Sequence, residues 1–268
     1  MSDIKVVISS PIDNNIYSLL VSNHCIKEHG VNITGIITLK TLSFVRIKSE
    51  YRRMGSSLFF KILNKFFANN TNKDTSVINK NNLISSIGLQ FKSLKNLAVK
   101  HTIPYIKVND LNNNESVNFL RKHKPDLVLS IGSTIIRTPF LEVPTIGTMN
   151  VHMGILPEYR GIGVTEWPLI ENRVSDIGLG VTLHFMDDKV DTGPIIKKQK
   201  INLDGCQSLH DLESKYLNEM VNLMIEGVQM ARDKKLSSEP QKNDRGRQYY
   251  SAHRRMRIIA EKRLLKLN

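Results

Sequence analysis

The chain of 268 residues has 40% hydrophobic and 24% charged residues, a composition typical of a globular protein that buries a core. Its formal net charge of +13 favours an anionic partner: a nucleic acid, a nucleotide, a phosphorylated metabolite or a membrane surface. With two cysteines, no secretory signal and no stretch of about 20 apolar residues, the sequence argues against a disulfide framework and a membrane span, and it predicts a cytoplasmic protein.

The first elements predict a parallel strand pair. Residues 4–10 and 31–39 are apolar runs typical of buried strands, and residues 14–30 between them have a helical pattern that ends at Gly30. A strand–helix–strand order predicts a crossover connection. Residues 51–70 repeat apolar side chains at helical spacing, which favours a helix on the core over a membrane-surface helix, and residues 68–82 form a polar loop.

The middle of the chain continues the alternation. We expect helices at 91–101 and 112–125, the second ended by Pro125, and strands at 103–109, 126–132, 147–152, 178–186 and 194–203. Residues 165–173 predict a short helix interrupted by Pro168. A long helix from Ser208 to about Lys235, a polar linker at 237–246 and a basic segment at 247–268 follow. The order predicts an α/β fold with a mostly parallel sheet flanked by helices.

The common cofactor motifs are absent from the sequence. No GxGxxG follows the first strand, and there is no GxxxxGK[ST], HExxH or CxxC. Dinucleotide, phosphate-loop and zinc sites therefore have no support from their usual sequence patterns.

Two stretches combine residues that suit acyl transfer. In "NVHMGILPEYRG", Asn150 and His152 stand two apart at the end of a predicted strand, so both point to one face. In "DKVDTGPII", Asp191 precedes the turn residues Thr192, Gly193 and Pro194. An amide can donate to an oxyanion, an imidazole can move protons, and a carboxylate can orient the imidazole. A lone Asn-x-His pair would instead predict a structural histidine.

Together, these stretches resemble the signature of the formyltransferases that use 10-formyltetrahydrofolate, a family with glycinamide ribonucleotide, methionyl-tRNA and sugar-nucleotide branches. The resemblance covers about residues 125–203. It implies a Rossmann-like formyltransferase fold, catalytic roles for Asn150, His152 and Asp191, and no metal. It also implies folate contacts, which would be at Ile131, Ser133, Asp187, Asp188 and Val190.

One departure from the family pattern is visible. Gly154 stands where the family usually has a serine before Leu-Leu-Pro, which puts one polar contact in doubt. His184 precedes Asp191 on a predicted strand; its orientation stays open, and we favour a structural role for it.

The resemblance also suggests the acceptor. The tail is too short and too helical for the β-barrel of the methionyl-tRNA enzymes, which leaves a nucleotide-linked amino sugar, with methionyl-tRNA as the alternative. Trp167 and the Tyr249–Tyr250 pair resemble motifs of the sugar-nucleotide branch, and the basic side chain of Arg160 suits an anionic acceptor; core packing is an equally good interpretation of Trp167. Arg46, Lys48, Arg52 and Arg53 either serve a diphosphate or form a solvated face.

The expected organisation is a catalytic domain at residues 1–206 and a C-terminal helical extension at 207–268. The expected partners are folate, the amino-sugar nucleotide and a second copy of the chain, rather than a membrane or nucleic acid. Two other classes stay open: a metal hydrolase with His152, His184 and Asp191 as ligands, and an RNA-binding protein. The second is disfavoured by an aromatic content of 6%.

Overall fold

The computed structural model describes residues 3–40, 91–132, 135–242 and 246–267. The predicted helix at 51–70, the loop at 68–82 and the four basic residues between 46 and 53 lie outside these ranges.

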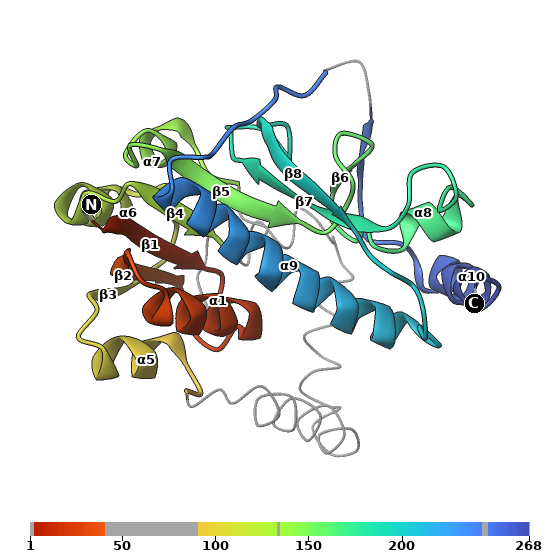
Figure 1. Ribbon diagram of the computed structural model, residues 1–268, viewed down its shortest axis with the longest axis horizontal. Helices are drawn as coiled ribbons and strands as arrows, with labels where there is room; N and C mark the ends of the chain where they lie inside the picture. Colours follow the sequence, from red (N-terminus) through yellow and green to blue (C-terminus); the bar gives the residue numbers. More distant parts are fainter. Residues whose placement is uncertain (1–2, 41–90, 133–134, 243–245, 268) are drawn as a thin grey trace.

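A seven-stranded sheet of order β3-β2-β1-β4-β5-β7-β8 forms the centre of the molecule (Figure 1). Neighbouring strands from β3 to β5 are parallel, whereas β5–β7 and β7–β8 are antiparallel. The predicted α/β class and mostly parallel sheet are confirmed. The strands are β1 (Ile4–Ser10), β2 (Val31–Leu39), β3 (Tyr105–Val108), β4 (Leu127–Ser130), β5 (Gly147–His152), β7 (Gly180–Phe185) and β8 (Ile195–Lys200).

Helices cover both faces of the sheet. The described helices are α1 (Ile16–Lys27), α5 (Leu94–Lys100), α6 (Asn114–His123), α7 (Thr138–Leu141), α8 (Trp167–Ile170), α9 (Leu209–Arg232) and α10 (Arg254–Leu264). Of these, α8 and α10 pack against each other at one end of the molecule (Figure 1). The longest, α9, lies across the sheet beside α1 (Figure 1).

Polar caps explain where the helices begin. The side chains of Asn15, Asn113 and Ser208 each accept a hydrogen bond from a backbone N–H in the first turn of α1, α6 and α9. At the other end of α6, Lys124 adopts a left-handed conformation and Pro125 follows. The long helix predicted from Ser208 is therefore α9, with Ser208 as its cap.

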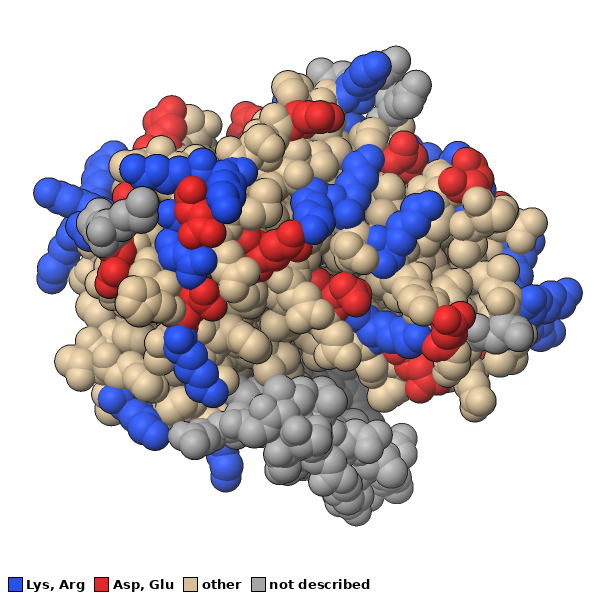
Figure 2. Space-filling view, viewed as in Figure 1, with Lys and Arg blue, Asp and Glu red and all other residues tan. Residues whose placement is uncertain are grey.

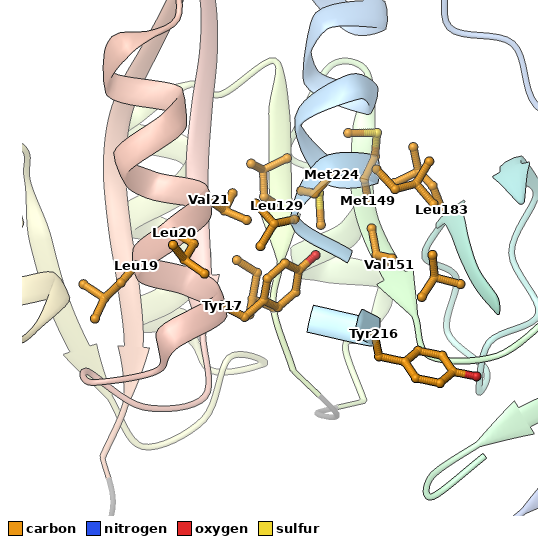
Figure 3. Packing of buried hydrophobic residues seen from close by; sticks show 14 of the residues in the cluster. Tyr17, Leu19, Leu20, Val21, Leu129, Met149, Val151, Leu183, Tyr216 and Met224 are labelled. Carbon is orange, nitrogen blue, oxygen red and sulfur yellow. The ribbon is translucent and has the colours of Figure 1, made fainter. Parts of the chain in front are cut away.

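The core has two main parts, one on each face of the sheet, and a third, smaller cluster of Tyr159, Val164 and Tyr249. Because side chains alternate along a strand, Val6 and Ile8 of β1 face the α1–α9 side, whereas Val7 faces α6 and α7. Figure 3 shows Val151 of β5 and Leu183 of β7 among side chains of α1 and α9. Burying one such side chain contributes about 1.5–3 kcal/mol, so this packing fixes β5 and β7 relative to α9.

Three local features differ from the sequence-based expectations. Pro168 stands in the first turn of α8, so it begins this short helix and does not interrupt it. The single turn of α7 was not predicted. The basic tail contains β9 (Arg247–Tyr249), which pairs in parallel with β6 (Tyr159–Gly161), before it continues into α10.

The surface seen in Figure 2 carries Lys and Arg side chains interspersed with Asp and Glu, so the net positive charge forms no single field on this face. No helix within the described ranges is both long and apolar enough to cross a bilayer.

Candidate active site

A cavity of about 490 Å³ opens where the parallel strands end. Its lining includes Ile131, just after β4, and the last residues of β5, together with part of α9. The carboxyl ends of parallel strands are the usual place for ligand sites in open α/β sheets. The cavity therefore lies at the edge of the sheet where the sequence placed Asn150 and His152.

Asn150 and His152 point into this cavity from β5. Their exposed fractions are only 8% and 6%, so both polar side chains need protein partners. Val151 between them points to the opposite face and packs in the core beside α9. The alternation inferred from the sequence is thus the reason that the two side chains lie on one face.

Asp191 joins them from the loop between β7 and β8. One carboxylate oxygen, Oδ2, lies 3.5 Å from His152 Nδ1 and accepts a hydrogen bond of 2.8 Å from the Gly161 N–H. The other ring nitrogen of His152, Nε2, lies 2.7 Å from the Tyr159 carbonyl oxygen. A carbonyl only accepts, so Nε2 donates to it. The imidazole is held at both nitrogens, between a carboxylate and a carbonyl.

His184 adds a second imidazole, directly opposite Asn150 in the β5–β7 register. Its Nδ1 donates to the Phe185 carbonyl at 2.7 Å, and burial lowers the pKa of His184 to about 4, against which the nearby Asp191 acts in the raising direction. The ring is therefore neutral, and its Nε2 accepts from Asn150 Nδ2 at 3.3 Å. This contact orients the Asn150 amide and leaves its second N–H for another acceptor.

The residues predicted to contact folate are only partly gathered. Ile131, Asp187 and Val190 line the cavity. Asp188 is exposed and is not among the lining residues, and Ser133 lies outside the described ranges. The Asp187 carboxylate accepts a hydrogen bond from the Thr192 hydroxyl, which closes the loop that carries Asp191.

The residues predicted to contact the acceptor lie beside the cavity and do not line it. Tyr249 stacks on Tyr159 and Trp167, with ring centroids 5.0 and 5.1 Å apart. The Trp167 indole N–H donates to the Tyr250 carbonyl at 2.8 Å, and the Tyr250 side chain is exposed. Arg160 is half-buried, and its guanidinium donates to Gln241. Trp167 and Tyr249 thus pack against each other where β6 meets β9.

The backbone groups that hold the site could not be predicted from the sequence. The Tyr159 carbonyl and the Gly161 N–H lie inside the "PEYRG" stretch, but a backbone donor or acceptor has no residue-type signal. His184 was visible from its seven-residue spacing to Asp191, yet its orientation depended on the antiparallel pairing of β7 with β5.

A second cavity, also about 490 Å³, lies at the opposite edge of the sheet, next to Pro125 and Thr145 before β4 and β5. It is lined by Arg121, Lys124 and Glu142 but by no His, Cys or Asp. Within the described ranges, no group of three or more His, Cys, Asp or Glu side chains is placed to hold a metal ion. The histidines that line these two cavities, His152 and His184, both belong to the first cavity.

Comparison with known proteins adds a family. The profile of the family described as formyl transferase matches residues 54–228. The methionyl-tRNA formyltransferase of Bacteroides fragilis is 28% identical over 153 residues, 57% of this chain and 46% of that protein. The match thus spans about half the length of that curated relative.

Solved structures share the fold over nearly the whole chain. An N-formyltransferase of Helicobacter canadensis, in complex with folinic acid and dTDP-3-aminofucose, superposes with a TM-score of 0.57 at 19% identity and covers 98% of this chain and 80% of its own. A 4-N formyltransferase of Francisella tularensis gives 0.56 at 14% identity, with 97% and 87% covered. At these identities the likeness establishes the fold alone.

Proposed function

The chain belongs to the formyl transferase family, and from that premise we propose that it transfers a formyl group from 10-formyltetrahydrofolate to the amine of a nucleotide-linked amino sugar. One observation carries the chemical part of this proposal. Asn150, His152 and Asp191 meet in one cavity, with His152 held between the Asp191 carboxylate and the Tyr159 carbonyl.

The reaction needs stabilisation of a negatively charged oxygen and two proton transfers, and each of these has a candidate group. The acceptor amine attacks the formyl carbon, a new C–N bond forms, and the bond from that carbon to folate N10 then breaks. Between these steps the formyl oxygen carries negative charge. The second N–H of Asn150, oriented by His184, can donate to this oxygen. A protonated His152 would add positive charge beside it.

Two protons also have to move. The attacking amine must lose one proton, and folate N10 must gain one before it leaves. The His152–Asp191 pair joins the end of β5 to the loop between β7 and β8 inside the cavity. We assign these transfers to that pair, with a water molecule as relay.

The donor side of the proposal rests on the cavity's lining. Ile131, Val190 and Asp187 border it with apolar and carboxylate groups, which suits a flat, partly polar ring system. The Helicobacter canadensis relative was solved with folinic acid, a folate compound, and this supports the same class of donor here.

For the acceptor, the comparisons support two candidates, a nucleotide-linked amino sugar and methionyl-tRNA. The Helicobacter canadensis and Francisella tularensis structures share the fold along almost all of this chain, including its tail, and the first holds a nucleotide-linked amino sugar. Sequence similarity favours the other candidate, because the Bacteroides fragilis relative is a methionyl-tRNA formyltransferase. We favour the amino sugar, with Arg160, Trp167, Tyr249 and Tyr250 on the acceptor side and a homodimer as the assembly.

An acceptor screen tests the proposal. Purified protein and 10-formyltetrahydrofolate would be combined with a panel of nucleotide-linked amino sugars or with methionyl-tRNA, and the release of tetrahydrofolate would be measured. We expect turnover with at least one amino-sugar nucleotide, and turnover at least about a hundredfold slower in the Asp191→Asn variant. Efficient formylation of methionyl-tRNA without turnover of any amino sugar would replace the acceptor but keep the chemistry. No transfer to either class would refute the proposal.

A further inference from the structure

Gln241 reaches the active-site loop from far along the chain. It lies between α9 and β9, outside the stretch that resembles the family signature. Its Nε2 donates to the backbone carbonyls of Asp191 at 3.0 Å and Gly193 at 2.7 Å. Its Oε1 accepts from the Arg160 guanidinium at 3.2 Å. One amide therefore connects the loop after β7 with β6.

These partners allow only one orientation of the amide. The two carbonyls can only accept, so they require the NH₂ group, and the guanidinium can only donate, so it requires the oxygen. A flipped amide would set oxygen against two oxygens and NH₂ against a cation. The contact is therefore specific for a side chain with a donor and an acceptor at this length.

The backbone just before Gln241 is paired. Two residues earlier, Glu239 forms an antiparallel bridge with Ile195 at the start of β8, with two hydrogen bonds of 2.8 Å. The side chain of Gln241 therefore extends from the end of a stretch that is hydrogen-bonded to the sheet.

The loop that Gln241 contacts contains a residue in a strained conformation. Asp191 has a φ of +52°, in the left-handed region that costs free energy for a residue with a Cβ. Its carboxylate must nevertheless stand where it accepts from the Gly161 N–H and faces His152. The two carbonyls that Gln241 bridges flank Thr192, so the contact spans this turn.

We propose that Gln241 is a positioning residue for the reaction: it fixes the turn at Asp191 and thereby the distance between the Asp191 carboxylate and His152. This inference rests on the proposed formyl transfer. It also assigns the segment after α9 a part in the chemistry, in addition to any contact with the acceptor.

The first test compares three full-length variants. Gln241→Ala removes the bridge, and Gln241→Glu keeps the length but puts oxygen against the two carbonyls. Gln248→Ala is the control, because Gln248 is an exposed glutamine on β9. We expect kcat to fall about ten- to a hundredfold in both Gln241 variants, the scale of a misplacement of about 1 Å, with KM for both substrates within about threefold. A Gln241→Glu variant with wild-type kcat would overturn the proposal.

A double-mutant cycle separates positioning from general support. If Gln241 acts through Asp191, then adding Gln241→Ala to Asp191→Asn should lower kcat less than about twofold further, because residues acting as a unit are non-additive. An undiminished further loss in the double variant would mean that Gln241 supports the fold and not the carboxylate, and would refute the proposal.

A measurement without turnover keeps this inference distinct from the proposed function. Hydrogen exchange of the Gly161 amide reports whether the Asp191 carboxylate stays in place. We expect faster exchange at this amide in Gln241→Ala and no change in Gln248→Ala. Unchanged exchange in Gln241→Ala would overturn the proposal even in an active enzyme. If Gln241→Ala speeds this exchange but the protein formylates no acceptor, the positioning role of Gln241 would stand and the proposed formyl transfer would be refuted.

Discussion

The single carboxylate of Asp191 offers the sharpest test of the site. Asp191→Asn keeps the side chain's shape but removes the negative charge 3.5 Å from His152 Nδ1. We expect kcat to fall at least about a hundredfold, the low end for loss of general acid–base assistance, with little change in substrate KM. Steady-state kinetics with both substrates would measure this. Asp176→Asn, at an exposed ion pair with Arg173, is the matched control.

The partner variant extends this prediction. His152→Asn should lose about as much turnover as Asp191→Asn, and the double variant little more, because the two side chains act as one unit. Near-wild-type turnover in Asp191→Asn would make Asp191 a turn residue only.

The buried ring of His184 predicts a pH dependence of stability. Its pKa is lowered from 6.5 to about 4, chiefly by burial, with His152 adding to the decrease and Asp191 opposing it. Between pH 6.5 and about 4, the His184 ring of the unfolded chain binds a proton, whereas the buried ring of the native protein does not. The free energy of unfolding should therefore fall as pH decreases from about 6.5 to 4, by roughly 3 kcal/mol.

Urea unfolding between pH 7.5 and 4.5 would measure this slope. His184→Gln, which keeps an acceptor for Asn150 but does not titrate, should flatten it. His210→Gln, at an exposed position, should leave it unchanged. An equal slope in His184→Gln and the wild type would show that other groups cause the dependence.

At the level of elements, the sequence predicted those helices and strands whose apolar residues repeat with a clear period. The run at 4–10 matches β1, and Ser208 begins α9, because an apolar strand and a capped amphipathic helix both leave clear patterns. The pairing of β6 with β9 left none, since a strand of three residues has no periodicity to detect. In the site, Asn150, His152 and Asp191 were singled out by two ordered motifs and by the family resemblance. Gln241 is one polar residue in a polar linker, and its partners are two backbone carbonyls and Arg160.

The crossing of α9 over the sheet gives a prediction at this scale. A Cβ on Gly227 would lie 2.6 Å from Leu183 Cδ2 and 3.2 Å from Met149 Cε, so α9 approaches β5 and β7 closely there. Gly227→Leu should lower the free energy of unfolding by about 1–3 kcal/mol, because overpacking outweighs a gain in helix propensity of up to about 1 kcal/mol.

Chemical denaturation would compare the free energy of unfolding of Gly227→Leu with that of Asn222→Leu. Asn222 is an exposed position on the same helix, where leucine gains helix propensity without a clash. If Gly227→Leu proved as stable as Asn222→Leu, the close approach of α9 to the sheet would be wrong.

For the whole molecule, truncation can test whether folate binding depends on the part of the chain before Ser237 and turnover also on the part after it. The residues that line the main cavity all precede residue 221, whereas Gln241, β9 and α10 follow Ser237. We expect a chain ending at Ser237 to bind a stable folate analogue within a few-fold of wild type. Its turnover should fall at least as far as in Gln241→Ala. Calorimetry would measure the folate affinity and steady-state kinetics the turnover, after circular dichroism shows that the truncated protein is folded. Loss of folate affinity in that folded protein would contradict the division.

The bridge between Glu239 and Ile195 also has a consequence for the order in which the enzyme matures. Synthesis proceeds from the N-terminus, and domains begin to fold while the chain is still being made. Asn150, His152 and Asp191 all leave the ribosome before residue 239. A nascent chain therefore contains the three residues to which we assign the chemistry for a period in which the Asp191 turn lacks its contact with Gln241. On our assignment of Gln241, the pocket forms first, and the turn at Asp191 gains its contact with Gln241 only after residue 241 has left the ribosome.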